Sequence, residues 1–244
     1  MSLPQTKNYD FDGEGEMLLI DKPLDWTSFQ VVKEVRNLFG IRKVGHAGTL
    51  DPRATGLLIL CTGKQTKSFD QMSAMEKEYT GTFELGIRTP SFDLETGVTE
   101  RAECSTVTSE QIRHVAMGFV GAQLQTPPMY SAVKYHGKPL YKYARKGRTV
   151  ERAPKEIDIS ELDIVSFDTP VVRFRVVCSK GTYIRSLIHD IGERLGCGAT
   201  LTSLRRTRIG EHRIEDAMTI EELEALRDEL RDRKHALDEN CVPA

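Results

Sequence analysis

Residues 44–56 read VGHAGTLDPRATG, and this glycine-rich stretch decides how the surrounding chain is organised. Glycines permit tight backbone turns and close approach of a ligand, while Pro52 restricts Asp51 before it to extended conformations. The apolar runs at 17–20 and 57–61 on either side are typical of buried strands. We therefore predict a loop that presents the Asp51 carboxylate from between rigid elements. Read alone, Asp-Pro is also an ordinary turn signature, and a histidine beside glycine, as at His46, is an ordinary loop hydrogen-bonding residue.

A helix is predicted between the first strand and this loop. Either Thr27 or Ser28 is suited to cap the N-terminus of a helix that runs to Phe39. Gly40 follows the last apolar position and is typical of a helix end. The order strand, turn, helix therefore precedes the loop.

The same order recurs near residue 180. Residues 171–177 alternate in part like a strand, and residues 179–181 predict a turn. Thr182 is suited to cap a helix that runs to Leu195 and closes at Gly196.

Further elements complete the predicted fold. Residues 79–85 alternate like a half-buried strand, and Ser109 is suited to cap a helix with apolar spacing over 111–119. Residues 220–237 place leucines at helical spacing among many charges, which predicts an amphipathic packing helix with a solvated face. Strands joined by both short turns and helices, without a steady βαβ rhythm, favour an α+β fold. We expect a central mixed, mainly antiparallel sheet flanked by helices and loops.

Composition indicates one domain in a reducing compartment. The chain has 244 residues, 39% of them hydrophobic, which suffices for one sizeable core. We predict a single domain over 1–244. The first sixteen residues are polar and acidic, unlike a signal peptide, and no apolar run is long enough to span a bilayer. Five cysteines without a C-x-x-C pair disfavour a disulfide framework and a structural zinc site, so we predict a cytoplasmic protein that avoids membranes.

Charge is divided along the chain. The formal net charge is -2, but residues 211–244 hold eleven acidic and five basic residues, a net of -6. Residues 1–210 therefore carry about +4, since -2 minus -6 is +4. The larger part of the chain is thus compatible with a polyanionic partner.

Residues 126–150 are basic and aromatic without a single Asp or Glu. Their charged and aromatic members are Lys134, Lys138, Lys142, Arg145, Lys146, Arg148, Tyr130, Tyr135, Tyr141 and Tyr143. Positive charge pairs with phosphates and aromatic faces stack on exposed bases, so this mixture favours looped or single-stranded RNA. Lys134, Tyr141 and Arg145 are the binding candidates. The alternative is a solvated basic loop.

Two other kinds of site are disfavoured. Gly63-Lys64 suggests a phosphate loop, but Leu58 stands where its first glycine is required and Gln65 where Ser or Thr would bind magnesium. Six scattered histidines and unpaired cysteines leave no convincing metal site. We therefore predict no metal.

Three motifs follow one another along the chain. They are Gly45-His46-Ala47-Gly48-Thr49-Leu50-Asp51-Pro52, Glu76-Lys77-Glu78-Tyr79 and Lys180-Gly181-Thr182-Tyr183-Ile184-Arg185. Taken in order, they resemble the motifs of the TruB family of tRNA pseudouridine synthases. The similarity includes Lys22-Pro23, residues 127–132 and Leu204-Arg205, and spans roughly residues 17–210. It implies a pseudouridine synthase fold, with a single catalytic domain over 1–244 that carries an RNA-binding insertion at about 125–152.

The resemblance implies an isomerisation of the T-loop uridine at tRNA position 55. The bond from uracil N1 to the ribose breaks, the base turns while held, and its C5 rejoins the same sugar carbon. Nothing is consumed, so no cofactor is expected. The family's catalytic aspartate falls on Asp51, for which two roles stay open: attack on the anomeric carbon, or removal of the neighbouring 2′ proton.

The resemblance also assigns roles to other residues. Tyr79 is expected to stack on the extruded uracil and to help remove the C5 proton, and Arg185 to pair with Asp51. From sequence alone, an exposed helical arginine is the default for Arg185. Extruding the uridine costs roughly a few kcal/mol, and His46 matches a histidine that packs where the base had been. Positions near the uracil or the active-site loop supply three further binding candidates, Lys22, Tyr183 and Leu204.

The chain departs from the family pattern in two places. Many relatives carry an RNA-binding PUA domain, whereas a short acidic helix follows Gly210, so we expect no PUA domain and fewer contacts to the acceptor end. Arg53 stands where an apolar residue is usual. Its side chain either faces solvent or RNA, or pairs locally.

Three other functions explain part of the sequence. An RNA chaperone that binds the T loop without turnover would use the same basic and aromatic residues, but Asp51, Tyr79 and Arg185 together favour turnover. A glycosidase normally needs a second carboxylate about 5 to 10 Å from the first, and no spacing in the sequence indicates such a partner for Asp51. The guide-RNA-directed branch of the superfamily uses partner proteins and a PUA domain, so the short tail favours action on tRNA alone. Because one closed domain suffices to recognise the shape of the T loop, we expect a monomer.

Overall fold

The computed structural model describes residues 8–239, which form two compact units. Unit 1 comprises residues 8–74 and 208–239, and unit 2 comprises residues 75–207. The chain leaves unit 1 after residue 74 and returns to it through strand β12 (Ala199–Ile209). The expectation of one catalytic domain over 1–244 stays a prediction.

Unit 1 is built on three antiparallel strands with β3 in the middle. β1 (Met17–Lys22) and β2 (Val44–Ala47) both pair with β3 (Ala54–Thr62), Leu18 of β1 and His46 of β2 lying opposite Leu60. Burial alternates along β1, as the two faces of a strand dictate. The predicted strand at 57–61 is therefore confirmed and is longer at both ends.

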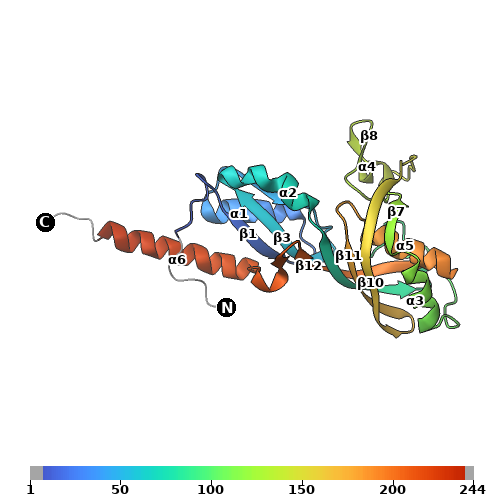
Figure 1. The fold of residues 1–244 in the computed structure, drawn as a ribbon. Coiled ribbons are helices and arrows are strands. Elements are labelled where there is room, and N and C mark those ends of the chain that lie inside the picture. The colour runs from blue at the N-terminus through green and yellow to red at the C-terminus, as the bar shows by residue number, and fades with distance from the viewer. Residues whose placement is uncertain (1–7, 240–244) are drawn as a thin grey trace. The chain divides into compact units, whose positions relative to one another are not determined.

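Helix α1 (Ser28–Phe39) begins and ends as the sequence predicts (Figure 1). Thr27 is the N-cap: its hydroxyl accepts from the Gln30 amide at 3.1 Å, and the Gln30 side chain accepts from the Thr27 amide at 2.7 Å. Gly40 closes the helix with φ of 65°, in the left-handed region that glycine adopts readily. The buried face of α1 packs with β1 and β3 to form the core of unit 1. Its members include Val31, Val32, Val35, Leu18, Ile20, Leu58 and Leu60.

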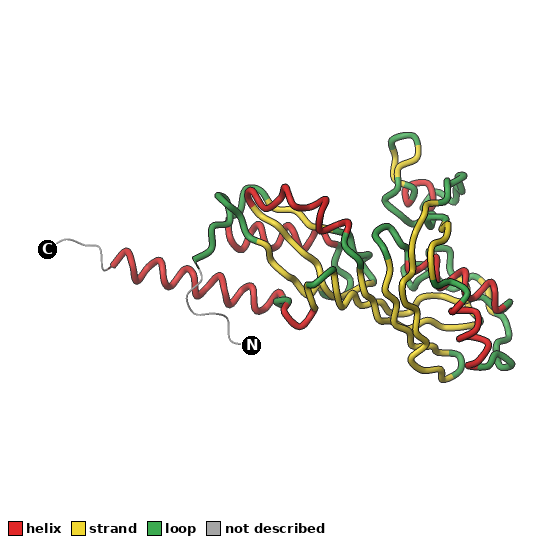
Figure 2. Tube along the Cα trace, in the orientation of Figure 1, coloured by secondary structure: helices red, strands yellow, loops and turns green. Residues whose placement is uncertain are grey.

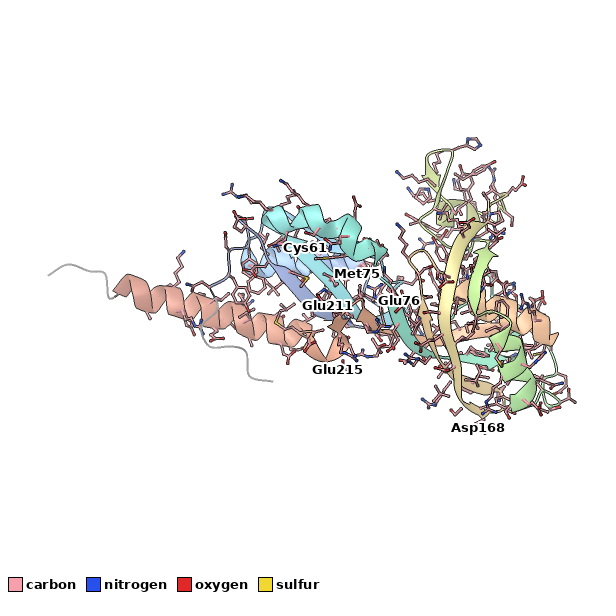
Figure 3. The ribbon with its side chains drawn as sticks, in the orientation of Figure 1. Cys61, Met75, Glu76, Asp168, Glu211 and Glu215 are labelled. Carbon is pink, nitrogen blue, oxygen red and sulfur yellow. The ribbon has the colours of Figure 1, made fainter. Side chains whose placement is uncertain are left out.

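Two short helices follow β3. Residues Gly63–Ser68 form the 3₁₀ helix η1, and Phe69–Ala74 form α2. Lys64 in η1 pairs with Glu14 at 2.5 Å, so its ammonium is engaged within unit 1. Cys61, labelled in Figure 3, lies on β3 with its sulfur 3.5 Å from that of Met72. The cysteines within residues 8–239 are free thiols, and Cys241 lies outside the described residues.

Among the described side chains of helix α6 (Ile220–Glu239), the buried ones lie in its first two turns. The helix follows β13 (His212–Arg213) and the 3₁₀ helix η2 (Ile214–Asp216), and Leu223 and Leu226 are buried. Residues 234–236 are exposed, and Figure 1 shows the later turns of α6 extending beyond β1. The prediction of an amphipathic packing helix with a solvated face is confirmed. The side chain of the predicted Leu237 lies outside the described residues.

Unit 2 contains a sheet in the order β12-β4-β11-β10-β7, flanked by helices (Figure 2). The bounds are β4 (Lys77–Leu85), β7 (Gly121–Gln125), β10 (Lys155–Asp168) and β11 (Val171–Cys178). β4 pairs antiparallel with β11, β11 with β10, and β10 with β7. Asp168 marks the hairpin between β10 and β11 in Figure 3. Together with two isolated parallel bridges, these pairings confirm the mixed, mainly antiparallel α+β prediction.

The two longer helices of unit 2 correct two predicted caps. Helix α3 (Ser109–Met117) is capped by Thr108 rather than Ser109, because the Thr108 hydroxyl accepts from the Gln111 amide at 3.2 Å. Helix α5 (Ile184–Leu195) has Tyr183 at its N-cap and ends at Gly196 as predicted.

The predicted cap at Thr182 is wrong because its hydroxyl is used in the preceding turn. That hydroxyl donates to the carbonyl of Ser179 at 3.0 Å. The Tyr183 side chain makes no capping bond, so α5 begins without one from that residue.

Short elements fill the remaining connections of unit 2. β5 (Ile87–Arg88) pairs with β6 (Glu100–Arg101), and β8 (Lys134–Tyr135) pairs with β9 (Lys138–Pro139). Helix α4 (Tyr141–Ala144) follows β9. The basic aromatic segment is therefore a hairpin and a helical turn inserted between β7 and β10.

Candidate active site

Asp51 lies in the loop between β2 and β3, as the sequence predicts. The side chain is half-buried, and the Asp51 carbonyl accepts from the Ala54 amide at 3.0 Å. Gly48 and Gly56 on either side have φ of 85° and 100°, values that L side chains rarely adopt. Glycine is thus required for the backbone path that presents Asp51.

Ser28 fixes the residue before Asp51. The hydroxyl of Ser28 accepts from the Leu50 amide at 2.9 Å and donates to the Leu50 carbonyl at 3.1 Å, and both residues are buried. One side chain at the start of α1 therefore satisfies both backbone groups of Leu50. A buried pair of this kind fixes backbone position because breaking it would strand polar groups away from water.

Lys22 fixes the residue after Asp51. Its side chain is fully buried, and its ammonium donates to the carbonyls of Pro23 at 2.9 Å, Trp26 at 2.5 Å and Pro52 at 3.4 Å. The Asp25 amide also donates to the Pro52 carbonyl, at 2.9 Å. Lys22, expected as a substrate-binding residue, is thus built into the support of the loop.

Arg53 pairs locally. Its guanidinium Nη1 lies 2.8 Å from a carboxylate oxygen of Asp25, a residue with φ of 62°. Of the two orientations left open by the sequence, the structure has the local ion pair. Since Asp25 also holds Pro52, this pair adds to the frame of the loop.

Tyr79 and Leu204 lie on the strands of unit 2. Tyr79 is in β4 opposite Val176 of β11 and is 8% exposed. Leu204 lies on β12 and is 9% exposed. His46, by contrast, is half-buried on β2 of unit 1.

Arg185 is buried in the first turn of α5, contrary to the default of an exposed helical arginine. It is 3% exposed, and its Nη1 and Nη2 donate to the carbonyls of Ser91 at 3.0 Å and Tyr130 at 2.9 Å. Its Nε lies 3.6 Å from a carboxylate oxygen of Asp93. The guanidinium is therefore held in one orientation by several partners within unit 2.

Sequence reasoning missed Asp93 and the loop that carries it. Asp93 is 4% exposed, and its backbone carbonyl accepts from the hydroxyls of Thr89 at 2.7 Å and Ser91 at 3.1 Å. Phe92 between them has φ of 66° and stacks on the ring of His189, with centroids 3.9 Å apart. The only available signal was Asp93 itself, since its partner Arg185 lies 92 positions later.

Tyr183 is fixed through its backbone. Gln125, at the end of β7, accepts from the Tyr183 amide at 2.8 Å and donates to the Tyr183 carbonyl at 3.0 Å. One turn into α5, the Ser186 hydroxyl donates to the carbonyl of Thr126 at 3.2 Å. The start of the basic insertion is therefore tied to the start of α5.

The three candidates in the insertion lie on its hairpin and helical turn. Lys134 on β8 is exposed, and Arg145 lies over the ring of Tyr141 at 5.4 Å. Arg145 also reaches Glu95 at 3.3 Å, an exposed pair of the kind that contributes little stability. Lys134 and Arg145 are thus exposed at the surface, and Tyr141 is half-buried.

The predicted residues fall in both units. Asp51, His46 and Lys22 belong to unit 1, and the other seven belong to unit 2. Within residues 8–239, no group of three or more His, Cys, Asp or Glu side chains is placed to hold a metal ion. The described helices are all too short or too polar to cross a membrane.

The family model for the N-terminal domain of TruB pseudouridylate synthases matches residues 36–184, which include the Asp51 loop, β4 and the insertion. The chain belongs to the TruB family. A second model, for the tRNA pseudouridylate synthase B C-terminal domain, matches residues 185–244. The family resemblance predicted from the three motifs is therefore confirmed.

Similar bacterial proteins carry the same family name. A tRNA pseudouridine synthase B of Chloroherpeton thalassium is 50% identical over 215 residues, which cover 86% of this chain and 89% of that protein. One of Phocaeicola vulgatus is 48% identical over 85% of this chain and 91% of that protein.

A solved structure shares the fold. The archaeal box H/ACA sRNP Nop10-Cbf5 complex contains a chain that matches with a TM-score of 0.69 and 27% identity. The match covers 92% of this chain and 57% of that chain, so this TruB-family chain spans little more than half the length of the matched chain.

Proposed function

We propose that this chain isomerises the T-loop uridine at tRNA position 55 to pseudouridine. The observation that carries the proposal is the Asp51 loop, in which buried Ser28 and Lys22 fix the residues on both sides of one carboxylate. Membership of the TruB family and the names of its similar relatives support the same reaction.

The reaction rearranges bonds without a second reactant. The bond between uracil N1 and ribose C1′ breaks, the base turns, and a bond forms between C5 and C1′. C5 loses its proton to solvent, and N1 takes one up. Asp51 serves as the catalytic carboxylate, either by attacking C1′ or by removing the 2′ proton.

The remaining residues handle the base and the RNA. Tyr79 stacks on the extruded uracil and assists removal of the C5 proton, while Arg185 keeps the catalytic carboxylate ionised. His46 occupies the space that the base leaves. Lys134, Tyr141 and Arg145 bind the T arm through phosphates and stacked bases. Near the uracil, Tyr183 and Leu204 complete the binding surface.

We infer that the chain acts on tRNA without a guide RNA or a partner protein, and as a monomer. The bacterial relatives at about half identity are named for tRNA, whereas the Cbf5 chain at 27% identity was solved with Nop10 in an sRNP. Activity of the purified chain on a bare tRNA transcript tests this, and light scattering gives its mass in solution. Activity that required an added guide RNA would contradict it.

A tritium-release assay tests the catalytic assignment. Transcripts labelled at uridine C5 lose tritium when the base is reattached, so release reports turnover. Asp51→Asn should abolish release and largely spare tRNA binding, since it removes the charge and keeps the shape. Asp70→Asn, at an exposed carboxylate of unit 1, is the matched control and should keep wild-type release.

Replacing the T-loop uridine with cytidine should also abolish release. Tight tRNA binding by the wild-type chain with no release from any uridine would instead favour the chaperone function.

A further inference from the structure

A pocket of about 460 Å³ lies in unit 2 at the base of the basic insertion. Its walls come from the start of the insertion, from β8 and from the residues that lead into β10. Asp51, Tyr79 and Arg185 do not line it. Figure 1 shows β8 and α4 standing together at one end of unit 2, next to β10 and β7. A volume of this size lies within the range of small-molecule and nucleotide sites.

One wall is apolar and carries an aromatic ring. Pro127, Val133 and Leu140 line it, and Leu140 is held by a bond from its amide to the Val133 carbonyl at 2.8 Å. Tyr135 is 36% exposed, and Tyr143 packs edge-on against it with centroids 5.8 Å apart. The ring of Tyr135 is therefore held in place while part of it stays open for stacking.

The other wall is cationic, and its own carboxylate neutralises only part of the positive charge. Lys134, Arg152 and Lys155 carry three positive charges against one negative charge on Glu151, a net of +2. Within residues 8–239, these four side chains form no ion pair with one another or with other described groups. The pocket thus offers positive charge to an anion.

Arg152 is incompletely satisfied. Its Nη1 donates to the Pro127 carbonyl at 3.0 Å, whereas its Nε is buried without a hydrogen-bond partner among the described residues. A buried donor of this kind costs free energy, and a small reorientation toward a bound phosphate would offset it. Positive charge and an unused donor therefore meet at one wall of the pocket.

We propose that this pocket binds one unpaired nucleotide of the substrate RNA, separate from the uridine that is isomerised. The proposal rests on the proposed function, because it takes tRNA as the substrate. The base stacks on Tyr135 against the apolar wall, and its phosphate lies at Lys134, Arg152 and Lys155. Glu151 accepts a hydrogen bond from the base.

The surroundings favour an RNA strand over a free nucleotide. Lys138, Lys142 and Arg148 are exposed in the same segment, and residues 126–150 contain no acidic side chain. A strand that enters the pocket would place its neighbouring phosphates among these cations. A free nucleotide would make no use of them.

Coupled binding measurements test the proposal. The affinity of a T-arm stem-loop RNA is measured by fluorescence anisotropy, and then repeated with RNAs that are abasic at one loop nucleotide at a time. Tyr135→Leu should weaken binding of the intact RNA by about tenfold or more. The same variant should not weaken binding of the RNA that is abasic at the nucleotide held by the pocket, because both changes remove the same stacking contact and their losses of affinity are therefore not additive.

Two further variants keep the test sharp. Lys155→Gln changes an exposed residue of the pocket. If Lys155 contacts a phosphate, the slope of log binding constant against log salt concentration should become shallower by about 0.7, the value for one contact to single-stranded RNA. If Tyr135→Leu fails to fold, the coupling of Lys155→Gln to the same abasic position carries the test. Lys142→Gln is the matched control: it is exposed in the same segment but outside the pocket. Its loss of affinity should be the same for intact and abasic RNAs.

Three results would overturn the proposal. They are an absence of coupling at every loop position, equal coupling for Lys142→Gln, and saturable binding of free AMP or GMP that leaves RNA affinity unchanged. Tritium release by the wild-type chain is measured separately. Coupling without release would remove the proposed function but leave the pocket, whereas release without coupling would remove only the pocket.

Discussion

Replacing Ser28 with alanine should remove one of the two supports that position Asp51 and leave the support at Pro52 in place. The substitution removes two hydrogen bonds, at 2.9 and 3.1 Å, and leaves the amide and carbonyl of Leu50 buried without that partner. Each bond contributes about 0.5–1.5 kcal/mol, and a stranded buried donor costs about 1–3 kcal/mol. We therefore expect a loss of about 2–3 kcal/mol in the free energy of unfolding.

Activity should fall further than stability. Leu50 precedes Asp51, and misplacing a catalytic group by about 1 Å can lower the rate about 100-fold. The expected result is a 10- to 100-fold lower kcat with a KM close to wild type, measured by tritium release at a temperature where the variant is fully folded. Denaturant unfolding gives the stability change.

Thr27→Ala is the matched control for Ser28→Ala. It removes the N-cap of the same helix, at a cost of about 1 kcal/mol, but Thr27 makes no contact with Leu50 through its capping bonds. This variant should lose stability and keep its kcat. If Ser28→Ala keeps wild-type kcat despite losing stability, or if Thr27→Ala loses as much activity, the hydroxyl does not position Asp51.

Two other predictions follow from buried cations of unit 2. Arg185→Lys should lower kcat in the tritium-release assay by about 100-fold and destabilise the fold, because one ammonium cannot replace the two guanidinium bonds to the carbonyls of Ser91 and Tyr130. A wild-type kcat for this variant would contradict the role assigned to Arg185. Burial lowers the pKa of Lys77 to about 8, with repulsion from Arg206 adding to it, so the unfolded chain binds more protons between pH 8 and 10.5. The free energy of unfolding should thus rise between pH 8 and 10.5, by up to about 3 kcal/mol more in the wild-type chain than in Lys77→Met, as measured by denaturant titration at each pH. If the two proteins gave parallel pH profiles, the lowered pKa of Lys77 would be refuted.

Local structure could be predicted where its determinants are close in sequence. Thr27 and Gly40 delimit α1 because capping bonds and left-handed glycine conformations involve neighbouring residues. Thr182 and Ser109 show the limit of that approach. Each is a sound capping residue by type, but the hydroxyl of Thr182 had a nearer acceptor at Ser179, and Thr108 provided the better cap for α3.

Candidate site residues could be named from motifs, but the contacts that support them could not. Asp51, Tyr79 and Arg185 stand in patterns that a sequence reader finds, whereas Ser28 and Asp93 act through contacts across 22 and 92 positions. A serine at a helix start and an aspartate in a loop are common, so neither carries a signal of its own. The burial of Lys22 likewise depends on carbonyls that the fold gathers around it.

Hydrogen bonds join the start of the basic insertion to the first turn of α5, so the two segments should move together. Gln125 holds both backbone groups of Tyr183, Thr126 accepts from Ser186, and Tyr130 accepts from Arg185. Residues 125–130 and the first turn of α5 are therefore connected directly by hydrogen bonds, and a displacement of one should displace the other. If RNA binds the basic hairpin as proposed, a displacement of that hairpin would move the Tyr130 carbonyl that holds Arg185, so substrate binding and the orientation of the guanidinium would change together.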